Sequence, residues 1–532
     1  MKTKKIIALL LSVAMTVPML AACGDKENNL QIEPLDGFKE EGFPIVENGY
    51  ELDVMLKYDS ARSGNIEDNT AFKEMEKLTN VKLNLNAIDS TSFKEKLSVT
   101  LAGGELPDVF LSCGLGRSLI QQQTKMGTFI DLKPYIEEYA PNIKKLLDES
   151  AELRNIVTLP TGEIPALPFF QINLENKKCP PEMMMVYKPW LDKLGLEMPE
   201  TTDDFYNVLK AFKEQDPNGN GKADEIPLCP RNLSHFYQMF AFFGIMANPT
   251  HNYMFLDGKE AQYAPLRPEF KEALAYFRKL YAEGLLDKDV FIQNQQQVLA
   301  KGTGADPVIG STITSGGFVI VGNERNADMV PTPIISKPGA KEKMWISREL
   351  ATPGAFAVSK ACEHPEVAVR WIDYLYSDEG AKLAWMGVEG VSYEYADDGT
   401  WTWIKEGEES ATEARARHTF NSGLNLGKFP VEWFDVNDGT ETVANEQRVW
   451  MVENFGDCLR LPVPTVYLES ADEKIISTTG TDLTQYVNQF IAQVVTGEID
   501  LDASWADFEA TCKRMGVDEM VQIYQSAFDK LS

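Results

Sequence analysis

The sequence predicts an α/β fold, and patterns near the start of the chain support this class. Hydrophobic residues alternate with polar ones over 50–57 and again over 81–85, as expected of strands. Between them, 72–78 carries hydrophobic residues at helical spacing. Strand, helix and strand in this order predict a unit with a parallel sheet.

The next segments continue the pattern. A helix is predicted at 92–101, and 105–110 leads into a strand. A short helix is predicted within 187–196, since a proline suits its first turn and a glycine its end. Residues 201–204 have the spacing of a capping box, before a helix with one hydrophobic face over 205–212.

Later segments are more hydrophobic. Aromatic residues cover nearly every side of 235–243, which predicts a buried helix, and 267–286 has the spacing of a longer one. Residues 308–321 predict a strand, a loop and a helix, and 355–359 a short strand. Pro365 begins a further predicted helix.

The chain begins with a targeting segment. Three lysines precede a hydrophobic run from Ile6 to about Leu20, which is too short to cross a bilayer. Leu-Ala-Ala-Cys at 20–23 resembles a bacterial lipobox. We therefore expect residues 1–22 to be a lipoprotein signal peptide and Cys23 to carry lipid at the outer face of the cell membrane. A plain signal peptide with a chance cysteine is the alternative.

Residues 23–48 carry many acidic residues and two prolines, and we expect them to form a solvated spacer between lipid and fold. The formal charge of the chain is −29, which disfavours nucleic acid and anionic polymers as ligands. The six cysteines after Cys23 are scattered, without the spacing of a zinc site. We expect most to be buried thiols and leave their pairing open.

Several stretches carry a family resemblance. Gly-Glu-Leu-Pro-Asp-Val stands at 104–109, Trp-Leu-Asp-Lys-Leu-Gly at 190–195, and Trp-Ile-Asp-Tyr-Leu-Tyr-Ser-Asp-Glu-Gly at 371–380, with further matches over 486–528. In this order they resemble extracellular solute-binding proteins of ABC sugar importers, the large carbohydrate-binding lipoproteins among them. Pro189 departs from the family, which usually has a polar residue before this tryptophan.

The resemblance implies a two-lobed, periplasmic-binding-protein-like (type II) fold, with a hinge and a ligand cleft between the lobes. The first lobe is expected to span 49–168 and 350–390, and the second 169–349 and 391–532. The implied function is to capture a carbohydrate, as a monomer, and deliver it to the permease subunits. No catalytic residue is expected.

Sugars stack on aromatic rings and form directed hydrogen bonds through their hydroxyl groups. By analogy, Tyr58 and Glu389 are expected polar contacts. The candidate rings are Phe169, Phe170, Tyr237, Trp345, Trp385, Trp401, Trp403 and Trp433. For each ring, a place in the core is the alternative.

Residues 216–225 have the composition of a calcium loop. Oxygen-bearing side chains stand at loop positions 1, 3, 5 and 9, with glycine at position 6. Position 12 is Pro227, so this is not an EF-hand, although the family often carries such a loop with bound Ca²⁺. The expected ligands of a structural calcium ion are Asp216, Asn218, Asn220, Lys222 through its carbonyl, Asp224 and Glu225. A metal-free turn is the alternative.

Two other functions stay open. With 80 acidic residues, a lipid-anchored glycoside hydrolase with a catalytic carboxylate pair is compatible with the composition. However, the chain lacks the sequence motifs of serine hydrolases, zinc proteases and nucleotide-binding enzymes. A peptide- or lipid-binding protein on the same scaffold is the other alternative.

Overall fold

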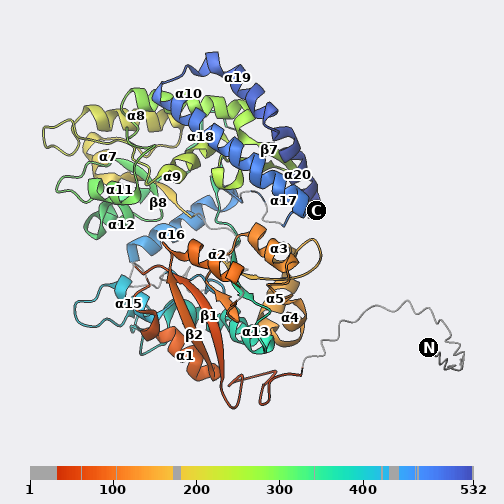
Figure 1. Cartoon of the computed structure of the whole chain (residues 1–532). Helices are drawn as coiled ribbons and strands as arrows, with labels where there is room; N and C mark the ends of the chain where they lie inside the picture. The colour runs from red at the N-terminus through yellow and green to blue at the C-terminus, as the bar shows by residue number, and fades with distance from the viewer. Residues whose placement is uncertain are drawn as a thin grey trace, which may run out of the picture. The chain divides into compact units, whose positions relative to one another are not determined.

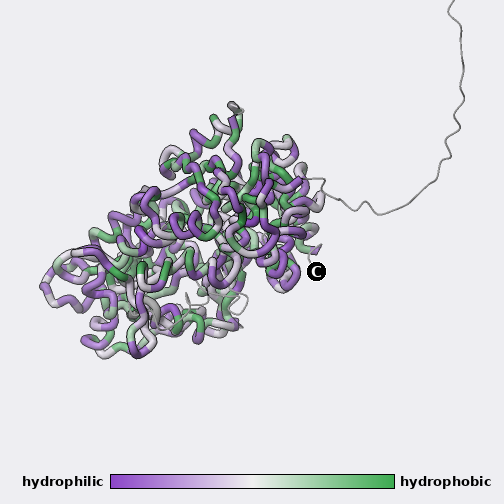
Figure 2. The backbone as a smooth tube through the Cα atoms, turned by 90° about the horizontal axis from the view of Figure 1, so that it is seen from below, coloured by the Kyte–Doolittle hydropathy of each residue, from purple (hydrophilic) through white to green (hydrophobic). Residues whose placement is uncertain are grey.

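The computed structural model describes residues 33–60, 63–103, 105–171, 181–340, 342–420, 423–430, 442–461, 463 and 467–529. The chain divides into two units, Met1–Glu33 and Pro34–Ser532, and the structure below is that of the second. The predicted signal peptide and Cys23 lie outside the described residues. Hydrophobic and hydrophilic stretches alternate at short intervals (Figure 2), and no described helix is long and apolar enough to cross a membrane.

The largest sheet among the described residues has five strands in the order β2-β1-β3-β11-β4. Strand β1 runs parallel to β2 and β3, whereas β11 is antiparallel to β3 and β4. The parallel sheet predicted from the alternating segments is therefore confirmed. The strands are β1 (Tyr50–Tyr58), β2 (Val81–Asp89), β3 (Val109–Leu111), β4 (Leu167–Phe170) and β11 (Ala351–Val358).

Helices pack around this sheet and together with it form the first lobe (Figure 1). Its core includes side chains from three strands and from α2, such as Met55, Phe110, Ala357 and Phe93. The helices are α1 (Thr70–Thr79), α2 (Phe93–Gly103), α3 (Arg117–Lys125), α4 (Lys133–Tyr139), α5 (Pro141–Glu149), α6 (Ala151–Val157), α13 (Pro365–Asp373) and α14 (Asp378–Met386).

The second lobe has a three-stranded antiparallel sheet with β5 at its centre, in the order β8-β5-β9. Two further strand pairs are β6 with β7 and β10 with β14. The strands are β5 (Met183–Tyr187), β6 (Met254–Asp257), β7 (Glu260–Tyr263), β8 (Ser311–Thr314), β9 (Met329–Pro331), β10 (Trp345–Ile346) and β14 (Leu459–Arg460).

One large hydrophobic core holds the second lobe together, and helices far apart in sequence contribute to it. Helices α10 and α18 pack side by side in this core. The helices are α7 (Lys188–Leu194), α8 (Thr202–Glu214), α9 (Leu233–Gln238), α10 (Pro268–Ala282), α11 (Gln295–Gly302), α12 (Phe318–Val321), α16 (Thr442–Phe455), α17 (Ser470–Ile475), α18 (Thr481–Thr496), α19 (Leu501–Arg514) and α20 (Val517–Asp529).

The predicted helix signals are confirmed where they rest on local chemistry. Thr201 and Asp204 form a reciprocal capping box at the start of α8. Gly195 ends α7 with a φ of 63°, a left-handed conformation that a residue without Cβ adopts at little cost. The aromatic segment 235–243 is buried as predicted, but its second half, Met239–Phe243, is a 3-10 helix.

Residues 34–48 correct the prediction of a solvated spacer. Ile45 and Val46 are buried at 0% and 1% exposure, and the Ile45 amide donates to the carbonyl of Thr79. The amide of Leu35 donates to Glu366 Oε1 at 3.0 Å, and Arg370 donates to the carbonyl of Gly42. The segment was predicted to be solvated because of its acidic composition, but its hydrophobic pair, Ile45 and Val46, packs on the first lobe.

Residues after 390 correct the predicted division of the lobes. The side-chain amide of Asn69, beside α1, donates to the carbonyls of Ala416 and Thr419. Thr70 pairs with His418 at 2.9 Å, and the backbone amide of Phe170 in β4 donates to Gly427. Residues 393–429 therefore pack on the first lobe through β12 (Tyr393–Tyr395), β13 (Trp401–Trp403), α15 (Ala411–His418) and the following segment. The lobe boundary at 390 was inferred from the family resemblance, and that resemblance did not predict these contacts.

The cysteines among the described residues are unpaired, and those at 113, 229, 362 and 512 are buried. Burial raises the pKa of Cys113, Cys362 and Cys512 to about 12. The predicted buried thiols are thus confirmed at these positions, whereas Cys179 lies outside the described residues.

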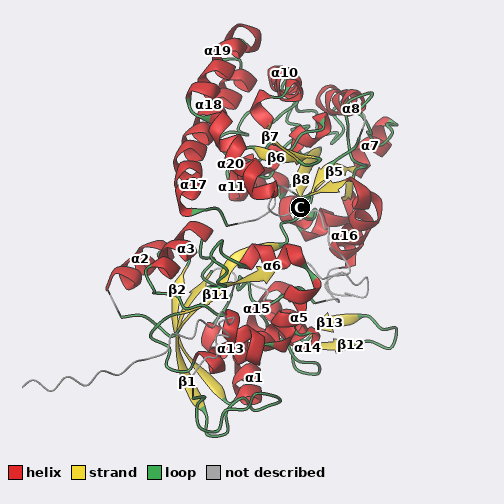
Figure 3. Cartoon of the chain, turned by 90° about the vertical axis from the view of Figure 1, so that its right-hand side faces the viewer, coloured by secondary structure: helices red, strands yellow, loops and turns green. Residues whose placement is uncertain are grey.

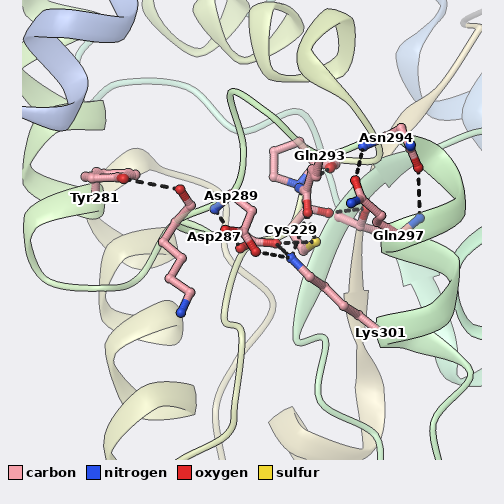
Figure 4. Close-up of polar contacts among 11 residues, drawn as sticks. Cys229, Tyr281, Asp287, Asp289, Gln293, Asn294, Gln297 and Lys301 are labelled. Carbon is pink, nitrogen blue, oxygen red and sulfur yellow. Dashed lines mark hydrogen bonds and ion pairs between the residues drawn. The ribbon is translucent and has the colours of Figure 1, made fainter.

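Cys229 belongs to a buried polar network in the second lobe (Figure 4). Its thiol donates to Asp287 Oδ2 at 3.1 Å, and the amine of Lys301 donates to the same oxygen at 2.8 Å. Lys301 also contacts Asp289 at 3.1 Å and the side-chain oxygen of Gln293 at 2.8 Å. Burial opposes ionisation of Asp287, but hydrogen bonds from Lys301 and its neighbours hold its pKa below the ordinary value.

We predict that Asp287→Asn destabilises the second lobe by about 3 kcal/mol, because it leaves Lys301 without its most buried anionic partner. Since the folded-state pKa of Asp287 is lowered, its contribution is full above the unfolded pKa of ~3.9 and is lost as pH falls through the folded value. Urea unfolding at pH 7 and at about pH 3 measures both effects.

Asp289→Asn is the matched control, because Asp289 contacts the same amine but is 38% exposed. It should cost well under 1 kcal/mol. Equal losses in the two variants would contradict a special role for the buried carboxylate.

Candidate ligand-binding site

A cavity of about 280 Å³ lies where two connecting segments between the lobes meet. One segment follows β4 and includes Gln171, and the other joins β10 to β11 over 346–349. Helix α9 and the following loop complete the wall. The lining residues are Gln171, Pro181, Glu182, Ser234, Tyr237, Gln238, Ala241, Met246, Ala247, Asn248, Thr250, His251, Ile346, Ser347, Arg348 and Glu349.

Pairing of β4 with β11 brings these segments together. Ala351 is opposite Phe170 in the register, and the backbone amide of Gln171 donates to the carbonyl of Leu350 at 2.9 Å. The side chain of Gln171 donates to Thr352 Oγ1 at 2.7 Å. The chain therefore passes the two expected lobe boundaries, near 168 and near 350, on neighbouring segments that are hydrogen-bonded to each other.

Glu182 presents a carboxylate to the cavity from just before β5. Gln238 Nε2 donates to its Oε2 at 2.9 Å, and His235 Nε2 lies 3.5 Å from its Oε1. Burial raises the pKa of Glu182, but hydrogen bonds and charge from His235, together with Gln238 and Arg348, outweigh it and hold the pKa below the ordinary value. Trp345 Nε1 fixes the backbone by donating to the Glu182 carbonyl at 2.8 Å.

Glu349 presents a second carboxylate, just before β11. His251 Nε2 lies 3.1 Å from its Oε1, and the Glu349 side chain is 30% exposed. Burial raises the pKa of Glu349, but the hydrogen bond and charge of His251, with the charge of Arg117, leave it below the ordinary value. Two carboxylates, those of Glu182 and Glu349, therefore line one cavity.

The rest of the lining offers neutral polar groups and limited apolar surface. Amides and hydroxyls come from Gln171, Asn248, Thr250 and Ser234, and the ring of Tyr237 lies among Ala and Met side chains. The Tyr237 hydroxyl donates to Asn488 Oδ1 at 3.0 Å. Such a surface suits a small ligand that both donates and accepts many hydrogen bonds.

The predicted calcium loop forms a closed turn in the second lobe, apart from the lining of the cavity. The Asp216 carboxylate accepts from the amides of Gly219 and Gly221, at 3.0 and 3.1 Å. The side-chain amides of Asn218 and Asn220 both donate to Asp224 Oδ1, at 3.0 and 3.2 Å. The side chains at loop positions 3, 5 and 9 thus point toward one another.

Glu225 follows them and is 4% exposed. Its Oε1 is buried and has no hydrogen-bond partner among the described residues. Burial raises its pKa, and the charges of Asp224 and Asp216 raise it further. Over the described part of the chain, no three acidic, histidine or cysteine side chains converge as a metal site. The loop nevertheless places three carboxylates within electrostatic reach of one another, one with an orphaned oxygen.

Comparison with known proteins gives the family. Residues 63–382 match the family described as bacterial extracellular solute-binding protein. The chain belongs to that family. This match covers more than half of the solute-binding protein and includes β3, the capping box of α8 and the start of α14.

Named relatives cover nearly the whole chain. The fructooligosaccharide ABC transporter substrate-binding protein FusA of Streptococcus pneumoniae serotype 4 is 28% identical over 551 residues, covering 98% of this chain and 97% of FusA. Lipoprotein LipO of Bacillus subtilis is 26% identical over 483 residues, covering 86% of this chain and 89% of LipO.

Solved structures show the fold. The structure of S. pneumoniae FusA with kestose has a TM-score of 0.75 and 24% identity, and covers 90% of this chain and 99% of FusA. An EF-hand mutant of FusA in complex with fructo-nystose has the same values. The predicted two-lobed α/β fold and the family resemblance are therefore confirmed.

The solute-binding protein places most of the predicted rings in its core. Phe169 stacks on Trp385 with ring centres 5.6 Å apart, and Phe429 packs edge-on against both. Phe170 is 1% exposed and contacts Tyr376. Trp401 and Trp403 form an edge-on pair in the β12–β13 hairpin. The cavity is not lined by any of these rings.

Tyr237 is the predicted ring that lines the cavity, and Trp345 stands behind it as the donor to Glu182. Tyr58 ends β1 and is partly exposed, and Glu389 is exposed in the turn before β12. Neither lines the cavity, and their roles stay predictions. Trp433 lies outside the described residues.

Sequence reasoning missed both carboxylates of the cavity and the histidines that pair with them. His235 lies in α9 and contacts Glu182 without lining the cavity, whereas His251 lines the cavity from the segment between α9 and β6. One available signal was position, since Glu182 and Glu349 each precede a strand and Glu349 lies at the expected lobe boundary. Acidic residues are too frequent in this chain for that signal to stand out.

We predict that the pH dependence of stability becomes shallower in the double variant Glu182→Gln, Glu349→Gln. Both carboxylates have a lowered pKa, so their contribution is full above the unfolded pKa of ~4.3 and is lost as pH falls through the folded values. The variant lacks these two titrations. Melting temperatures measured from pH 6 down to about pH 3 test this, and parallel curves for variant and wild type would contradict it.

Proposed function

We propose that this protein is the extracytoplasmic substrate-binding component of an ABC transporter, and that it captures an oligosaccharide in the cavity beside the connecting segments. The observation that carries the proposal is a pair of carboxylates among neutral hydrogen-bonding groups. Glu182 is fixed by Gln238, and Glu349 is fixed by His251. Sugar hydroxyls donate to such oxygens and accept from amides such as that of Gln171. Membership of the solute-binding family and the fructooligosaccharide ligands of FusA support this reading.

The proposal extends to the location and partners. Cys23 would carry lipid and hold the protein at the outer face of the membrane. The permease subunits would bind the protein as a sugar-bound monomer. The proposal is binding without cleavage, because both cavity carboxylates, Glu182 and Glu349, have a lowered pKa, whereas the general acid of a glycoside hydrolase needs a raised one.

We predict a selective rise in melting temperature when the chain without its first 23 residues meets one class of oligosaccharide. A panel containing kestose, maltotriose, diacetylchitobiose, raffinose and short peptides tests this. At a hundredfold excess over the dissociation constant, binding stabilises the folded state by ~2.7 kcal/mol. Glu182→Gln should weaken binding of the active sugar by about 10- to 100-fold, because a hydrogen bond to a charged acceptor is lost.

Glu137→Gln is the matched control, because it removes the same charge from an exposed position on α4 of the first lobe. A shift with peptides alone would contradict carbohydrate binding. Loss of the active sugar over time, followed by chromatography, would instead identify a glycoside hydrolase.

We further propose that the 216–225 loop binds a structural calcium ion. Its donors would be the side chains of Asp216, Asn218, Asn220, Asp224 and Glu225 and the carbonyl of Lys222, which are the oxygen ligands that calcium takes. A cation there would offset the mutual repulsion of the carboxylates and engage the orphaned Glu225 oxygen. The EF-hand of FusA, which is mutated in one of its solved structures, supports this assignment.

We predict that calcium raises the melting temperature of the wild type and that Glu225→Gln removes most of this rise. In chelator, the same variant should be as stable as the wild type or slightly more so, because it removes a buried charge that lacks a partner. Asp306→Asn, which contacts the side chain of Asn220 from outside the loop, is the control and should keep the calcium response. An equal response to calcium in Glu225→Gln would contradict the assignment.

A further inference from the structure

Helix α18 supports the cavity of the second lobe through polar side chains on one of its faces. Figure 3 shows α18 along one side of this lobe, between α17 and α19. Thr484 and Asn488 stand one turn apart on this helix, so their side chains share a face. Neither residue lines the cavity. Each of them nevertheless contacts a segment that does.

Asn488 holds the hydroxyl group of Tyr237, the aromatic ring that lines the cavity from α9. The Tyr237 hydroxyl donates to Asn488 Oδ1 at 3.0 Å. A phenol has one proton to donate, and this bond uses it, so Tyr237 offers a ligand its ring and an acceptor oxygen. A bond at the far end of the side chain also fixes the direction of the ring in the cavity wall.

The same oxygen of Asn488 holds a second part of the wall, the 248–253 turn. The Tyr253 hydroxyl donates to Asn488 Oδ1, and the rings of Tyr253 and Tyr237 pack edge-on, 6.0 Å apart. The backbone amides of Tyr253 and His251 both donate to the carbonyl of Asn248, at 2.9 and 3.1 Å. Asn248 and His251 line the cavity. One acceptor atom therefore joins α9 to the turn.

The backbone of the 248–253 turn needs such support. Asn252 and Tyr253 have φ angles of 52° and 60°, in the left-handed region that is unfavourable for a side chain with Cβ and most of all for a bulky one. Such a conformation persists only where the surrounding structure holds it. The Asn252 side chain accepts from Thr484 Oγ1 at 3.3 Å and donates to the Tyr524 hydroxyl at 3.3 Å. Helix α18 thus holds both left-handed residues, one through Thr484 and the other through Asn488.

We propose that Asn488 is a positioning residue for ligand binding, which holds the ring of Tyr237 and the 248–253 turn at fixed places in the cavity wall. This inference rests on the proposed function. Without the shared acceptor, the Tyr237 side chain gains rotational freedom and the turn loses one of its anchors. Binding must then order both again, and the free energy of this ordering is subtracted from that of binding.

The test compares three variants of α18. The probe is kestose, or the panel sugar with the largest shift if kestose gives none, and calorimetry well below the melting temperatures measures its dissociation constant. Asn488→Leu removes the acceptor and should weaken binding by about 5- to 100-fold, the factor expected for ordering two side chains. Asn488→Asp keeps an acceptor oxygen and should restore most of the affinity.

Val494→Ala is the matched control for stability. Val494 is fully buried on the same helix and does not line the cavity. Its truncation should lower the melting temperature, because it leaves a void in the core, while the dissociation constant stays that of the wild type. A change in affinity that follows stability alone would therefore appear in this variant too.

The two tyrosines identify the route. Tyr237→Phe and Tyr253→Phe each remove a hydroxyl group that Asn488 holds. In the variant carrying both changes, Asn488→Leu should weaken binding no further, because no phenol is left for Asn488 to hold. A further loss of the same size would overturn the inference, as would an equal loss in Asn488→Asp and Asn488→Leu.

The dissociation constant also separates positioning from a structural role. A lowered melting temperature with wild-type affinity in Asn488→Leu would make Asn488 merely structural and would overturn the inference. Wild-type affinity in Asn488→Leu while Glu182→Gln weakens binding would leave the proposed function standing without this inference. If the wild type binds no sugar in the panel, the proposed function fails, and the inference fails with it.

Discussion

The antiparallel pairing of β4 with β11 is the constraint on which the rest of the structure depends. These strands come from segments some 180 residues apart, yet their hydrogen bonds place Gln171 beside Leu350. Both cavity carboxylates are near these points in the sequence: Glu182 follows the first, and Glu349 directly precedes the second. A shift of the β4–β11 register by one residue would separate Gln171 from Leu350 and displace Glu349, which precedes Leu350, relative to Gln171. The cavity therefore depends on that pairing.

The sequence predicts the secondary structure well where local chemistry decides it. Alternation over 50–57 and 81–85, the Thr201 capping box and the Gly195 helix end are all confirmed, because each depends on residues within one turn or one strand. The lobe boundary depends instead on contacts between segments that are far apart in the sequence. Residues 393–429 return to the first lobe through contacts with Asn69 and Phe170, which no local pattern encodes.

The candidate site is predicted far less well, for a physical reason. Aromatic rings near a hinge are prominent in a sequence, but Phe169 and Trp385 are large apolar surfaces, and stacking them on each other buries both. The residues proposed to bind a polar ligand are ordinary Glu, Gln and His side chains, and their surroundings in the fold give them this role. His235 matters because it lies beside Glu182, and that proximity is created by the fold.

The buried cysteines have a consequence for maturation. Members of this family work outside the cell, where disulfides form readily, yet the described cysteines are unpaired. Oxidants react with the thiolate, and burial keeps the thiols at 113, 362 and 512 protonated and out of contact with solvent. Folding itself therefore protects these sulfurs. These sulfurs are therefore open to oxidants only before the cores that bury them have formed.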